Sequence, residues 1–394
     1  MRIVFFTHPP FLGSQSMPRF ASMLANGMQQ RGHQIEVWTP EAYFYKLSAP
    51  NSLKKWLGYL DQYMMFPGQV RKRIKSYPGQ TLFVFTDHAL GPWVPLVANR
   101  PHVIHCHDFL AQQSAFGKIK ENPTSFTGRL YQKFIHKGYS KGKNFVSVSN
   151  KTSRDLNEFL IKKPQLSDVV YNGLNRNFKP LEIEKSRQVF GKSVGIDLST
   201  GFILHIGGNQ WYKNREGVIE IYESWRKLGN GKLPLLLIGK EPSSALKQKQ
   251  EQSAFARDIF FLTDINDEQT LLAYAGATLL LFPSLAEGFG WPIAEAMASG
   301  CPVVTTNEAP MTEVAGNAGF LIKKRDDQKG GINLWADEAA LVVDRVINLS
   351  PAEREIVIES GIKNAKRFQT ENMLNNIEEI YRFLTKSFEI RLEK

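Results

Sequence analysis

The chain has 394 residues, enough for two domains of ordinary size, and carries a formal net charge of +11 at pH 7. The positive charge lies in the first half, because residues 1–180 contain 24 Lys and Arg against 9 Asp and Glu, whereas the remainder contains 25 against 29. The acidic second half and the lack of a nucleic-acid-binding motif argue against a nucleic-acid partner.

Cysteine content and hydropathy indicate in which compartment the protein resides and whether it spans a membrane. Two cysteines, Cys106 and Cys301, are too few for a disulfide framework or a metal cluster, and they favour a reducing compartment. No apolar run approaches the roughly 20 residues that a transmembrane helix needs, and the chain enters the strand-like run RIVFF without a signal-peptide pattern. We therefore expect a cytoplasmic protein that neither is secreted nor spans a membrane.

Short runs of β-branched and other apolar residues alternate with helical stretches along the whole chain. They lie at 2–8, 34–38, 81–86, 102–106 and 144–149, then at 202–207, 233–239, 259–263, 278–282 and 302–306. Such alternation favours parallel sheets covered by helices, in which ligands bind beyond the carboxyl ends of the strands. We predict an α/β protein with one domain over 1–175, a linker over 176–200 and a second domain over 201–370.

The turn after the first strand, THPPFLGSQSMPRF, contains one glycine and does not match the dinucleotide pattern G-x-G-x-x-G. Gly13 and Ser14 can still bring the backbone close to a diphosphate or an acceptor. Arg19, about one turn into the following helix, could meet an anionic acceptor or be a plain surface arginine, and both interpretations stay open.

Residues 51–76 combine an apolar stripe with a basic cluster. The stripe falls on one face at helical spacing and consists of Leu53, Trp56, Leu57, Leu60 and Met64. The basic residues that follow are Arg71, Lys72, Arg73 and Lys75. An ordinary amphipathic helix would pack this stripe on the sheet of the first domain. Contact with an anionic membrane surface is the alternative, since each basic residue near such a surface contributes about 1 kcal/mol.

The run HVIHCHDF places two histidines on one face of a strand, since they stand two residues apart. The simplest interpretation of His105 is a structural role. His107 and Asp108 stand at the carboxyl end of the strand, where we expect ligands to bind. His107 is therefore a candidate site residue, with Asp108 as the group that could orient its ring.

The run HIGGNQWYKNREGVIEIY, residues 205–222, reads as a strand, a Gly-Gly pair, polar residues and a helix. Lys213 and Arg215 stand at the predicted start of this helix, where the helix dipole disfavours cations. A bound anion explains them better than solvent does, and a solvated helix end is the alternative. We therefore predict a phosphate-binding loop that includes Gly208, Asn209, Lys213 and Arg215.

The run SLAEGFGWPIAEAMASG places Glu287 and Glu295 eight residues apart, on either side of a glycine loop and of Pro292. A strand precedes the loop and a helix follows it, and proline suits the first helical turn. The start of such a helix attracts phosphate, and both carboxylates could reach hydroxyls of a ligand lying across it. The alternative is a loop glutamate and an ordinary glutamate on a helix surface.

The segment EGFGWPIAEAMASGCPVV resembles the E-x7-E region of retaining GT-B glycosyltransferases of family GT4, and the likeness continues to Ile322. In that family the first glutamate holds the donor sugar and the second binds the nucleotide ribose. The resemblance thus implies these roles for Glu287 and Glu295. It also implies that the intervening loop binds the donor through Gly288, Phe289, Gly290 and Trp291.

Two further segments resemble the same family. GT4 enzymes commonly have Arg-Lys-Asn before the helix that begins here near residue 215, and the basic side chains clamp the donor diphosphate. Lys213 and Asn214 match, Tyr212 replaces the arginine, and Arg215 is our candidate for the second cation. The family also carries a histidine that contacts the donor sugar, which His107 matches. Positioning is its expected role, because in such enzymes the leaving phosphate is thought to deprotonate the acceptor.

The resemblance implies a GT-B fold, with two Rossmann-like domains facing across a cleft and a final helix over 371–394 that packs on the first domain. It implies a retaining glycosyltransferase that moves a sugar from a nucleotide-diphosphate sugar to a glycan or lipid-linked acceptor. The catalytic residues would be Glu287, His107 and Lys213. No DxD pair or cluster with metal-ligand spacing is present, so we expect neither a metal nor another cofactor.

Two alternatives remain open. A nucleotide-sugar epimerase of the same fold would need paired acid and base groups, which the sequence does not display. A catalytically silent nucleotide-sugar-binding subunit would not need both Glu287 and Glu295. If the acceptor is lipid-linked, we expect peripheral association with the inner face of the membrane.

Overall fold

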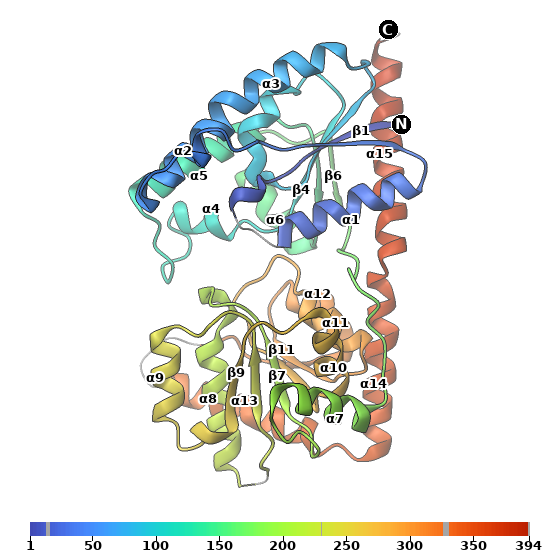
Figure 1. Ribbon diagram of the computed structural model, residues 1–394. Helices are drawn as coiled ribbons and strands as arrows, with labels where there is room; N and C mark the ends of the chain where they lie inside the picture. Colours follow the sequence, from blue (N-terminus) through green and yellow to red (C-terminus); the bar gives the residue numbers. More distant parts are fainter. Residues whose placement is uncertain (13–15, 230, 326–330, 393–394) are drawn as a thin grey trace. The chain divides into compact units, whose positions relative to one another are not determined.

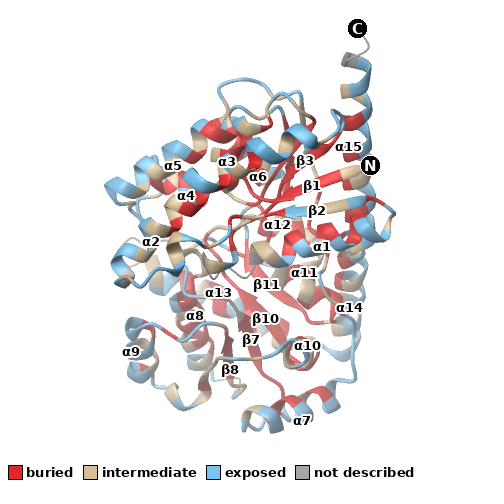
Figure 2. Ribbon diagram, turned by 45° about the horizontal axis from the view of Figure 1, so that its top comes forward, coloured by how far each residue is buried: buried red, intermediate tan, exposed pale blue. Residues whose placement is uncertain are grey.

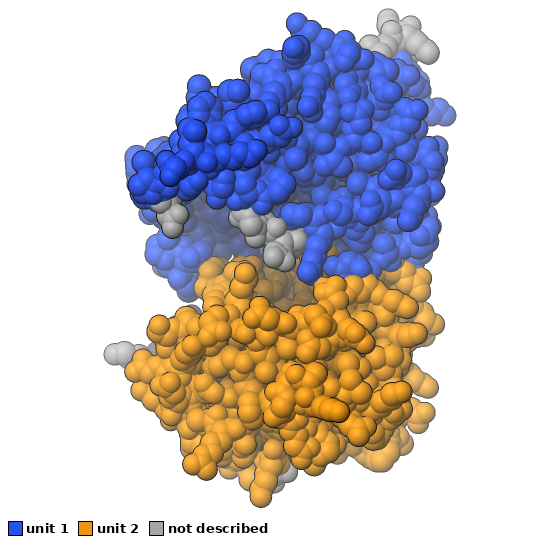
Figure 3. Space-filling model, in the orientation of Figure 1, with its two compact units in different colours: residues 1–175, 370–394 blue, residues 176–369 orange. Residues whose placement is uncertain are grey.

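The computed structural model describes residues 1–12, 16–229, 231–325 and 331–392 (Figure 1). The chain divides into two compact α/β units (Figure 3). The first unit comprises Met1–Asn175 and Thr370–Lys394, and the second comprises Arg176–Gln369. The last helix, α15, is therefore grouped with the first unit although it follows the second in sequence.

The first unit is built on a six-stranded parallel sheet with the order β2-β1-β3-β4-β5-β6. Its strands are β1 (Arg2–Phe6), β2 (Gln34–Trp38), β3 (Leu82–Phe85), β4 (His102–Cys106), β5 (Asn144–Ser147) and β6 (Leu166–Val169). The central strands are buried on both faces (Figure 2), which explains why they read as continuous apolar runs. The sixth strand was not expected, because LSDV is polar and lies at the sheet edge.

Helices cover both faces of this sheet. They are α1 (Ser16–Gln30), α2 (Asn51–Leu60), the π-helical turn η3 (Asp61–Met65), α3 (Phe66–Arg73), α4 (Leu110–Ala115), α5 (Phe126–Tyr139), α6 (Asn150–Phe159) and α15 (Thr370–Leu392). Short 3-10 helices are η1 (Pro10–Leu12), η2 (Phe44–Lys46), η4 (Ile74–Ser76) and η5 (His88–Leu96). Alternate residues of β1 enter different cores: Val4 and Phe6 pack with α3, η5 and α5, whereas Ile3 and Phe5 pack with α1 and α15.

Helix α15 packs on the first sheet through a stripe of apolar side chains. Leu374, Ile377 and Tyr381 are buried in the same core as Ile3 and Phe5. The approach to α1 is close, since a Cβ at Gly27 would lie 2.6 Å from a methyl carbon of Leu374. The returning helix therefore supplies part of the core of the first unit.

The second unit contains another six-stranded parallel sheet, with the order β12-β11-β10-β7-β8-β9. Its strands are β7 (Ile203–Ile206), β8 (Leu235–Ile238), β9 (Ile259–Leu262), β10 (Leu279–Phe282), β11 (Val303–Thr306) and β12 (Phe320–Ile322). The short edge strand β12 was not expected from the sequence.

Its helices are α7 (Ile183–Val194), α8 (Arg215–Lys227), α9 (Ser244–Gln252), α10 (Asp267–Gly276), α11 (Trp291–Ala298), α12 (Met311–Ala315), α13 (Gly331–Ile347) and α14 (Pro351–Ala365). Short 3-10 helices are η6 (Trp211–Lys213), η7 (Ala256–Asp258), η8 (Gly316–Ala318) and η9 (Lys366–Phe368). One face of the sheet forms a core with α8 and α13.

The segment 176–200, which we expected to be a linker, belongs to the second unit and contains α7. Helix α7 ends at Gly195, whose φ of 72° suits a left-handed C-cap. Phe190 is fully buried, and Arg187 Nε donates a hydrogen bond of 2.9 Å to Gly276 O at the end of α10. Its mixed charges and its glycines concealed this helix in the sequence.

Candidate functional site

The candidate site lies at the carboxyl ends of β7 and β10. Strand β7 pairs with β8 on one side and with β10 on the other, so the strand order changes direction between β7 and β10. Parallel α/β sheets bind ligands beyond the carboxyl ends of their strands at such a switch point. The predicted phosphate-binding loop follows β7, and the loop of the E-x7-E region follows β10.

Asn214 joins the two loops. It adopts a left-handed conformation with φ of 52°, and its side chain caps α8 by accepting a hydrogen bond from Gly217 N. Its Nδ2 donates a hydrogen bond of 2.9 Å to Pro283 O, while Leu285 N donates one of 2.7 Å to Tyr212 O. The residue before the α8 cap is therefore held beside the loop that follows β10.

This arrangement brings Lys213 and Glu287 together. Lys213 Nζ lies 2.7 Å from Glu287 Oε1, and the two side chains are only 16% and 8% exposed. The ammonium group also lies 5.2 Å from the centre of the Phe282 ring, at the end of β10. A lysine ammonium has three donors, so one bond to a carboxylate leaves donors for an anion.

His205, within β7, adds a buried hydrogen-bond acceptor to the site. The sequence analysis did not identify this residue. Its Nδ1 donates a hydrogen bond of 3.0 Å to Leu281 O, so Nε2 carries the lone pair. Burial, reinforced by the nearby cations, lowers its pKa to about 3, and the ring is neutral. Among the described residues, Nε2 has no hydrogen-bond partner. A Cβ at Gly207 would lie 3.0 Å from this atom and 3.4 Å from Lys213 Cδ, so the glycine leaves this space open.

Arg215 faces the loop after β8 and contacts another predicted residue. Its Nη1 donates hydrogen bonds to Asn209 Oδ1 and, at 2.9 Å, to Lys240 O. Burial lowers its pKa to about 10, so the group is charged at neutral pH. Within the described part of the chain its Nε and Nη2 atoms lack hydrogen-bond partners, although the guanidinium lies 5.2 Å from the centre of the Phe261 ring. The loops that follow β7 and β8 approach each other closely at Gly239. A Cβ at this position would lie 2.1 Å from Gly207 O, which explains why a glycine is present.

The glycine-rich loop after β10 leads into α11. Gly290 is the N-cap with φ of 101°, a conformation that L residues with side chains rarely adopt, and Pro292 lies in the first turn. Phe289 is buried and packs edge-on against Trp291, with ring centres 6.2 Å apart. The predicted helix start is therefore present, and a glycine caps it without a side-chain bond.

Glu295 lies one turn inside α11 and contacts a residue that the sequence did not indicate. Its Oε2 accepts a hydrogen bond of 2.7 Å from the hydroxyl of Tyr274, which is buried in α10. Burial, and then the adjacent carboxylate, raise the pKa of Tyr274 well above its usual value. The hydroxyl thus remains a donor, and it holds the Glu295 carboxylate in a fixed orientation.

In the first unit, His107 follows β4 and is buried. Its Nε2 donates a hydrogen bond of 2.9 Å to Thr86 O, and burial lowers its pKa. The Phe20 ring packs edge-on against it with centres 4.5 Å apart. Asp108, which could have oriented this ring, instead accepts a hydrogen bond of 3.0 Å at its Oδ1 from Leu110 N at the start of α4.

The remaining predicted residues of the first unit are less informative. His105 has a structural contact, since Nε2 lies 2.8 Å from the hydroxyl of Tyr381 in α15. Arg19 is exposed on α1. Gly13 and Ser14 lie outside the described residues.

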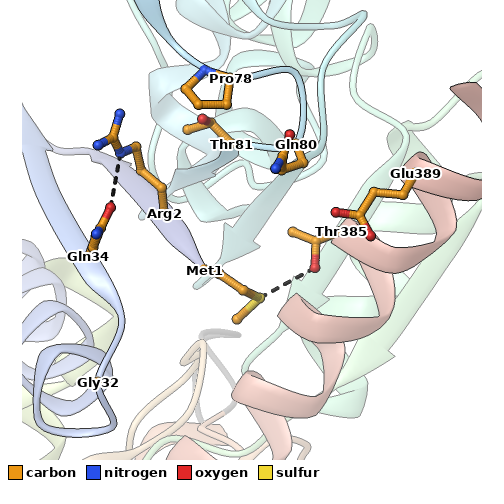
Figure 4. Close-up of a pocket in the computed structure, with 9 residues that line it drawn as sticks. All are labelled: Met1, Arg2, Gly32, Gln34, Pro78, Gln80, Thr81, Thr385 and Glu389. Atoms are coloured by element: carbon orange, nitrogen blue, oxygen red, sulfur yellow. Dashed lines mark hydrogen bonds between the residues drawn. The ribbon is translucent and has the colours of Figure 1, made fainter.

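A cavity of about 450 Å³ lies at the amino ends of β1, β2 and β3 (Figure 4). It is lined by Met1, Arg2, Gly32, Gln34, Pro78, Gln80, Thr81, Thr385 and Glu389. Ligands of parallel α/β sheets bind at the carboxyl ends of the strands, so this cavity is on the wrong edge to be the candidate site.

The part of the chain that the structure describes contains neither a cluster of metal ligands nor a membrane-spanning helix. In residues 1–12, 16–229, 231–325 and 331–392, no group of three His, Cys, Asp or Glu side chains is arranged to hold a metal ion. Nor does any helix within these ranges have the length and apolar character needed to cross a membrane.

Comparison with known proteins shows two family matches in succession. Residues 17–178 match the family described as Glycosyltransferase Family 4, and residues 186–342 match Glycosyl transferases group 1. The O-antigen chain mannosyltransferase B of Escherichia coli is 30% identical over 186 residues, which are 47% of this chain and 46% of that protein. The chain spans about half the length of the first curated relatives that it matches.

Solved structures share the fold over nearly the whole chain. Anabaena Alr3699/HepE in complex with UDP and glucose has a TM-score of 0.69 at 17% identity, with 96% of this chain and 99% of that chain covered. WaaG, a glycosyltransferase involved in lipopolysaccharide biosynthesis, has a TM-score of 0.70 at 17% identity with the same coverage. At this level of identity, the likeness shows the fold alone.

Proposed function

Since the chain belongs to the GT-B glycosyltransferases of family GT4, we propose that it transfers a sugar from a nucleotide-diphosphate sugar to an acceptor, with retention at the anomeric carbon. The observation that carries the proposal is the pairing of Lys213 with Glu287 at the switch point of the second sheet. A cation suits the diphosphate of such a donor, and a carboxylate suits the hydroxyls of its sugar. The structurally similar Anabaena Alr3699/HepE, solved in complex with UDP and glucose, supports a donor of this class.

The proposed catalytic role of Lys213 is to stabilise the leaving diphosphate. Negative charge accumulates on the phosphate as the sugar departs, so a fixed ammonium group stabilises the transition state more than the ground state. Arg215, which is charged and buried nearby in the same loop region, would add to the positive potential. With Gly208 and Asn209 it would hold the donor phosphates. These cations supply the charge that a metal ion supplies elsewhere, and we propose metal-independent transfer.

The two glutamates would hold different parts of the donor. Glu287, bonded to the lysine that faces the diphosphate, is assigned to the sugar. Glu295 is assigned to the ribose, because a carboxylate oriented by Tyr274 suits a vicinal diol. The loop from Gly288 to Trp291 would bring backbone groups close to the ligand. For His107 we propose a role in positioning the sugar.

We further propose that the first unit contacts an anionic membrane surface that carries a lipid-linked acceptor. Tyr59 of α2 stacks on Tyr131 of α5 at 5.2 Å, and the Tyr63 and Tyr131 hydroxyls are 2.7 Å apart, so α2, η3 and α5 pack side by side. Around these contacts lie exposed apolar side chains, which we call the apolar face. Its members are Leu53, Trp56, Met64, Phe126, Leu130 and Phe134.

Charge favours a membrane as the occupant of this face. Trp56 is 54% exposed, and Leu53 and Met64 are exposed as well, so packing on the sheet does not account for these three residues of the predicted stripe, whereas Leu57 and Leu60 are half-buried. Exposed cations lie on the same or the following helices, namely Arg129, Lys133 and Lys137 on α5 and Arg71, Lys72 and Arg73 at the end of α3. Apolar anchors beside cations match a bilayer surface with anionic headgroups.

The proposed donor chemistry is tested by thermal denaturation with UDP, GDP, ADP and their sugar conjugates. A ligand at a hundred times its Kd should stabilise the native state by about 2.7 kcal/mol. The conjugate that stabilises most is then incubated with glycan and lipid-linked acceptors, and NMR of the anomeric proton reads the product's configuration. Inversion would refute the retaining mechanism, whereas a lack of response to every nucleotide would refute donor binding.

A further inference from the structure

A second cluster of titratable side chains lies at the carboxyl edge of the first sheet. Strand β1 pairs with β2 on one side and with β3 on the other, so this sheet also has its switch point beside β1. His8 follows β1, and Asp87 and His88 follow β3. The cluster therefore occupies the position where sheets of this type bind ligands, and no role assigned above uses it.

Asp87 is tightly held at this edge. Its Oδ2 lies 2.9 Å from His8 Nε2, and its Oδ1 accepts a hydrogen bond of 3.0 Å from Ala89 N and lies 3.1 Å from His88 Nδ1. Burial on its own would raise the pKa of this carboxyl, but the hydrogen bond from His8 and the adjacent His88 ring outweigh it and hold the pKa well below its usual range. Asp87 is therefore a carboxylate near neutral pH, and it can only accept hydrogen bonds.

This bond determines the tautomer of His8. Because Asp87 has no proton to give, His8 Nε2 carries the proton, and in the neutral ring Nδ1 then carries the lone pair. The loop itself is anchored, since Thr39 Oγ1 donates to His8 O at 3.2 Å. Among the described residues no partner bonds His8 Nδ1, and the side chain is 17% exposed. A carboxylate that fixes an imidazole in this way is a common means of orienting a histidine toward a substrate.

The charge of Asp87 decides what His8 can bind. A phosphate group at Nδ1 would lie close to the buried carboxylate and would be repelled by it. A hydroxyl group, in contrast, is neutral and can donate its proton to the lone pair. The dyad therefore suits the hydroxyl of a sugar rather than an anionic group.

Building on the proposed transferase function, we propose that His8 binds a hydroxyl group of the glycan acceptor through Nδ1, and that Asp87 acts through His8 as a positioning residue. The acceptor would be recognised here by a neutral, hydroxyl-bearing part. Losing one neutral hydrogen bond should weaken acceptor binding by about tenfold.

The first test reads the tautomer and the contact directly, without turnover. Protein labelled with ¹⁵N at histidine is studied by long-range ¹H–¹⁵N NMR at mildly alkaline pH, and the signals of His8 are identified by their loss in His8→Gln. We expect the Nε2–H tautomer, and a shift of Nδ1 when octyl glycosides of glucose, galactose or mannose are added. An Nδ1–H tautomer, or an Nδ1 signal that none of these glycosides moves, would overturn the proposal.

The second test separates acceptor binding from donor chemistry. Transfer to the octyl glycosides is compared with hydrolysis of the nucleotide sugar by water, which needs no bound acceptor. In His8→Ala and Asp87→Asn, the acceptor KM should rise about tenfold while hydrolysis and nucleotide affinity stay at wild-type values. Equal losses in both reactions would mean that the dyad is structural only.

His136→Gln is the matched control, because it removes a histidine of the same unit whose Nε2 lies 2.8 Å from a backbone carbonyl. Its acceptor KM should not change. If the protein turns over no nucleotide sugar, the transferase proposal fails, and the NMR titration still decides whether His8 binds sugar hydroxyls.

Discussion

Replacement of Lys213 by alanine tests the donor site most directly, because this residue pairs with Glu287 in the structure. The two groups are 2.7 Å apart and largely buried, so the contribution of this ion pair to stability should lie between those of exposed and fully buried pairs. Exposed ion pairs contribute about 0–1 kcal/mol to stability, whereas breaking a buried pair costs about 3–5 kcal/mol. We expect Lys213→Ala to lower the free energy of unfolding by roughly 1–3 kcal/mol, through the uncompensated Glu287 carboxylate.

The effect on catalysis should be larger than the effect on stability. A charge developing on the leaving phosphate about 4 Å from Lys213 Nζ would be stabilised by about 4 kcal/mol at an effective dielectric constant of 20. Because each 1.36 kcal/mol corresponds to a factor of ten, kcat/KM should fall on the order of a thousandfold. Part of the loss should appear as weaker binding of the nucleoside diphosphate, since the ammonium also faces phosphate charge in the ground state.

Calorimetry with the nucleoside diphosphate and steady-state turnover of the nucleotide sugar measure the two effects separately. Lys249→Ala is a control, because Lys249 pairs at 2.6 Å with Glu220, whose side chain is 10% exposed, in the same unit but outside the site. This variant should bind and turn over the donor as wild type does. Unchanged diphosphate affinity and turnover in Lys213→Ala would refute the assigned role.

Three other outcomes follow from the same assignments. Glu287→Gln should reduce transfer on the order of a hundredfold or more while leaving affinity for the nucleoside diphosphate near wild type, and equal turnover would remove this residue from the site. Activity should survive EDTA, whereas abolition by EDTA with rescue by Mg²⁺ or Mn²⁺ would contradict metal-independent transfer. The protein should co-sediment with phosphatidylglycerol vesicles, less so at high salt and after residues 71–73 are changed to Ser. A protein that ignores these vesicles at low salt would direct the search to an acceptor that is not membrane-bound.

The sequence was sufficient to predict the strands in the interior of each sheet. Strands that are buried on both faces of a parallel sheet have continuous apolar sequences, which can be recognised from a short stretch of the chain alone. Two of the four edge strands, β6 and β12, escaped for the opposite reason, because β6 reads LSDV and β12 has three residues and is partly exposed. The other two, β2 and β9, were predicted at 34–38 and 259–263. Helix α7 was not predicted because its sequence pattern is weak. Contacts with α10 stabilise it, and these contacts cannot be recognised in the local sequence.

The residues of the proposed donor site were predictable only where they belong to a local motif. The E-x7-E region and the lysine before α8 are short segments, and the structure brings Lys213 and Glu287 together. The groups that support them belong to no motif. Tyr274 occupies an ordinary apolar position of α10, and His205 is a polar residue inside a strand whose partner is a carbonyl of β10. These contacts depend on tertiary structure, which spacing along the chain does not encode.

The pairing of His8 with Asp87 in the first sheet also could not be predicted from the sequence, because it depends on the order of the strands. His8 and Asp87 stand 79 residues apart, and neither belongs to a pattern that would have singled it out. They meet because β1 pairs with β3 as well as with β2, so the residues that follow β1 and β3 share one edge of the sheet. Alternation of strands and helices predicts a parallel sheet, but it does not give the order of the strands. Since the strand order determines which loops are neighbours at the carboxyl edge, the pairing of His8 with Asp87 becomes visible only once that order is known.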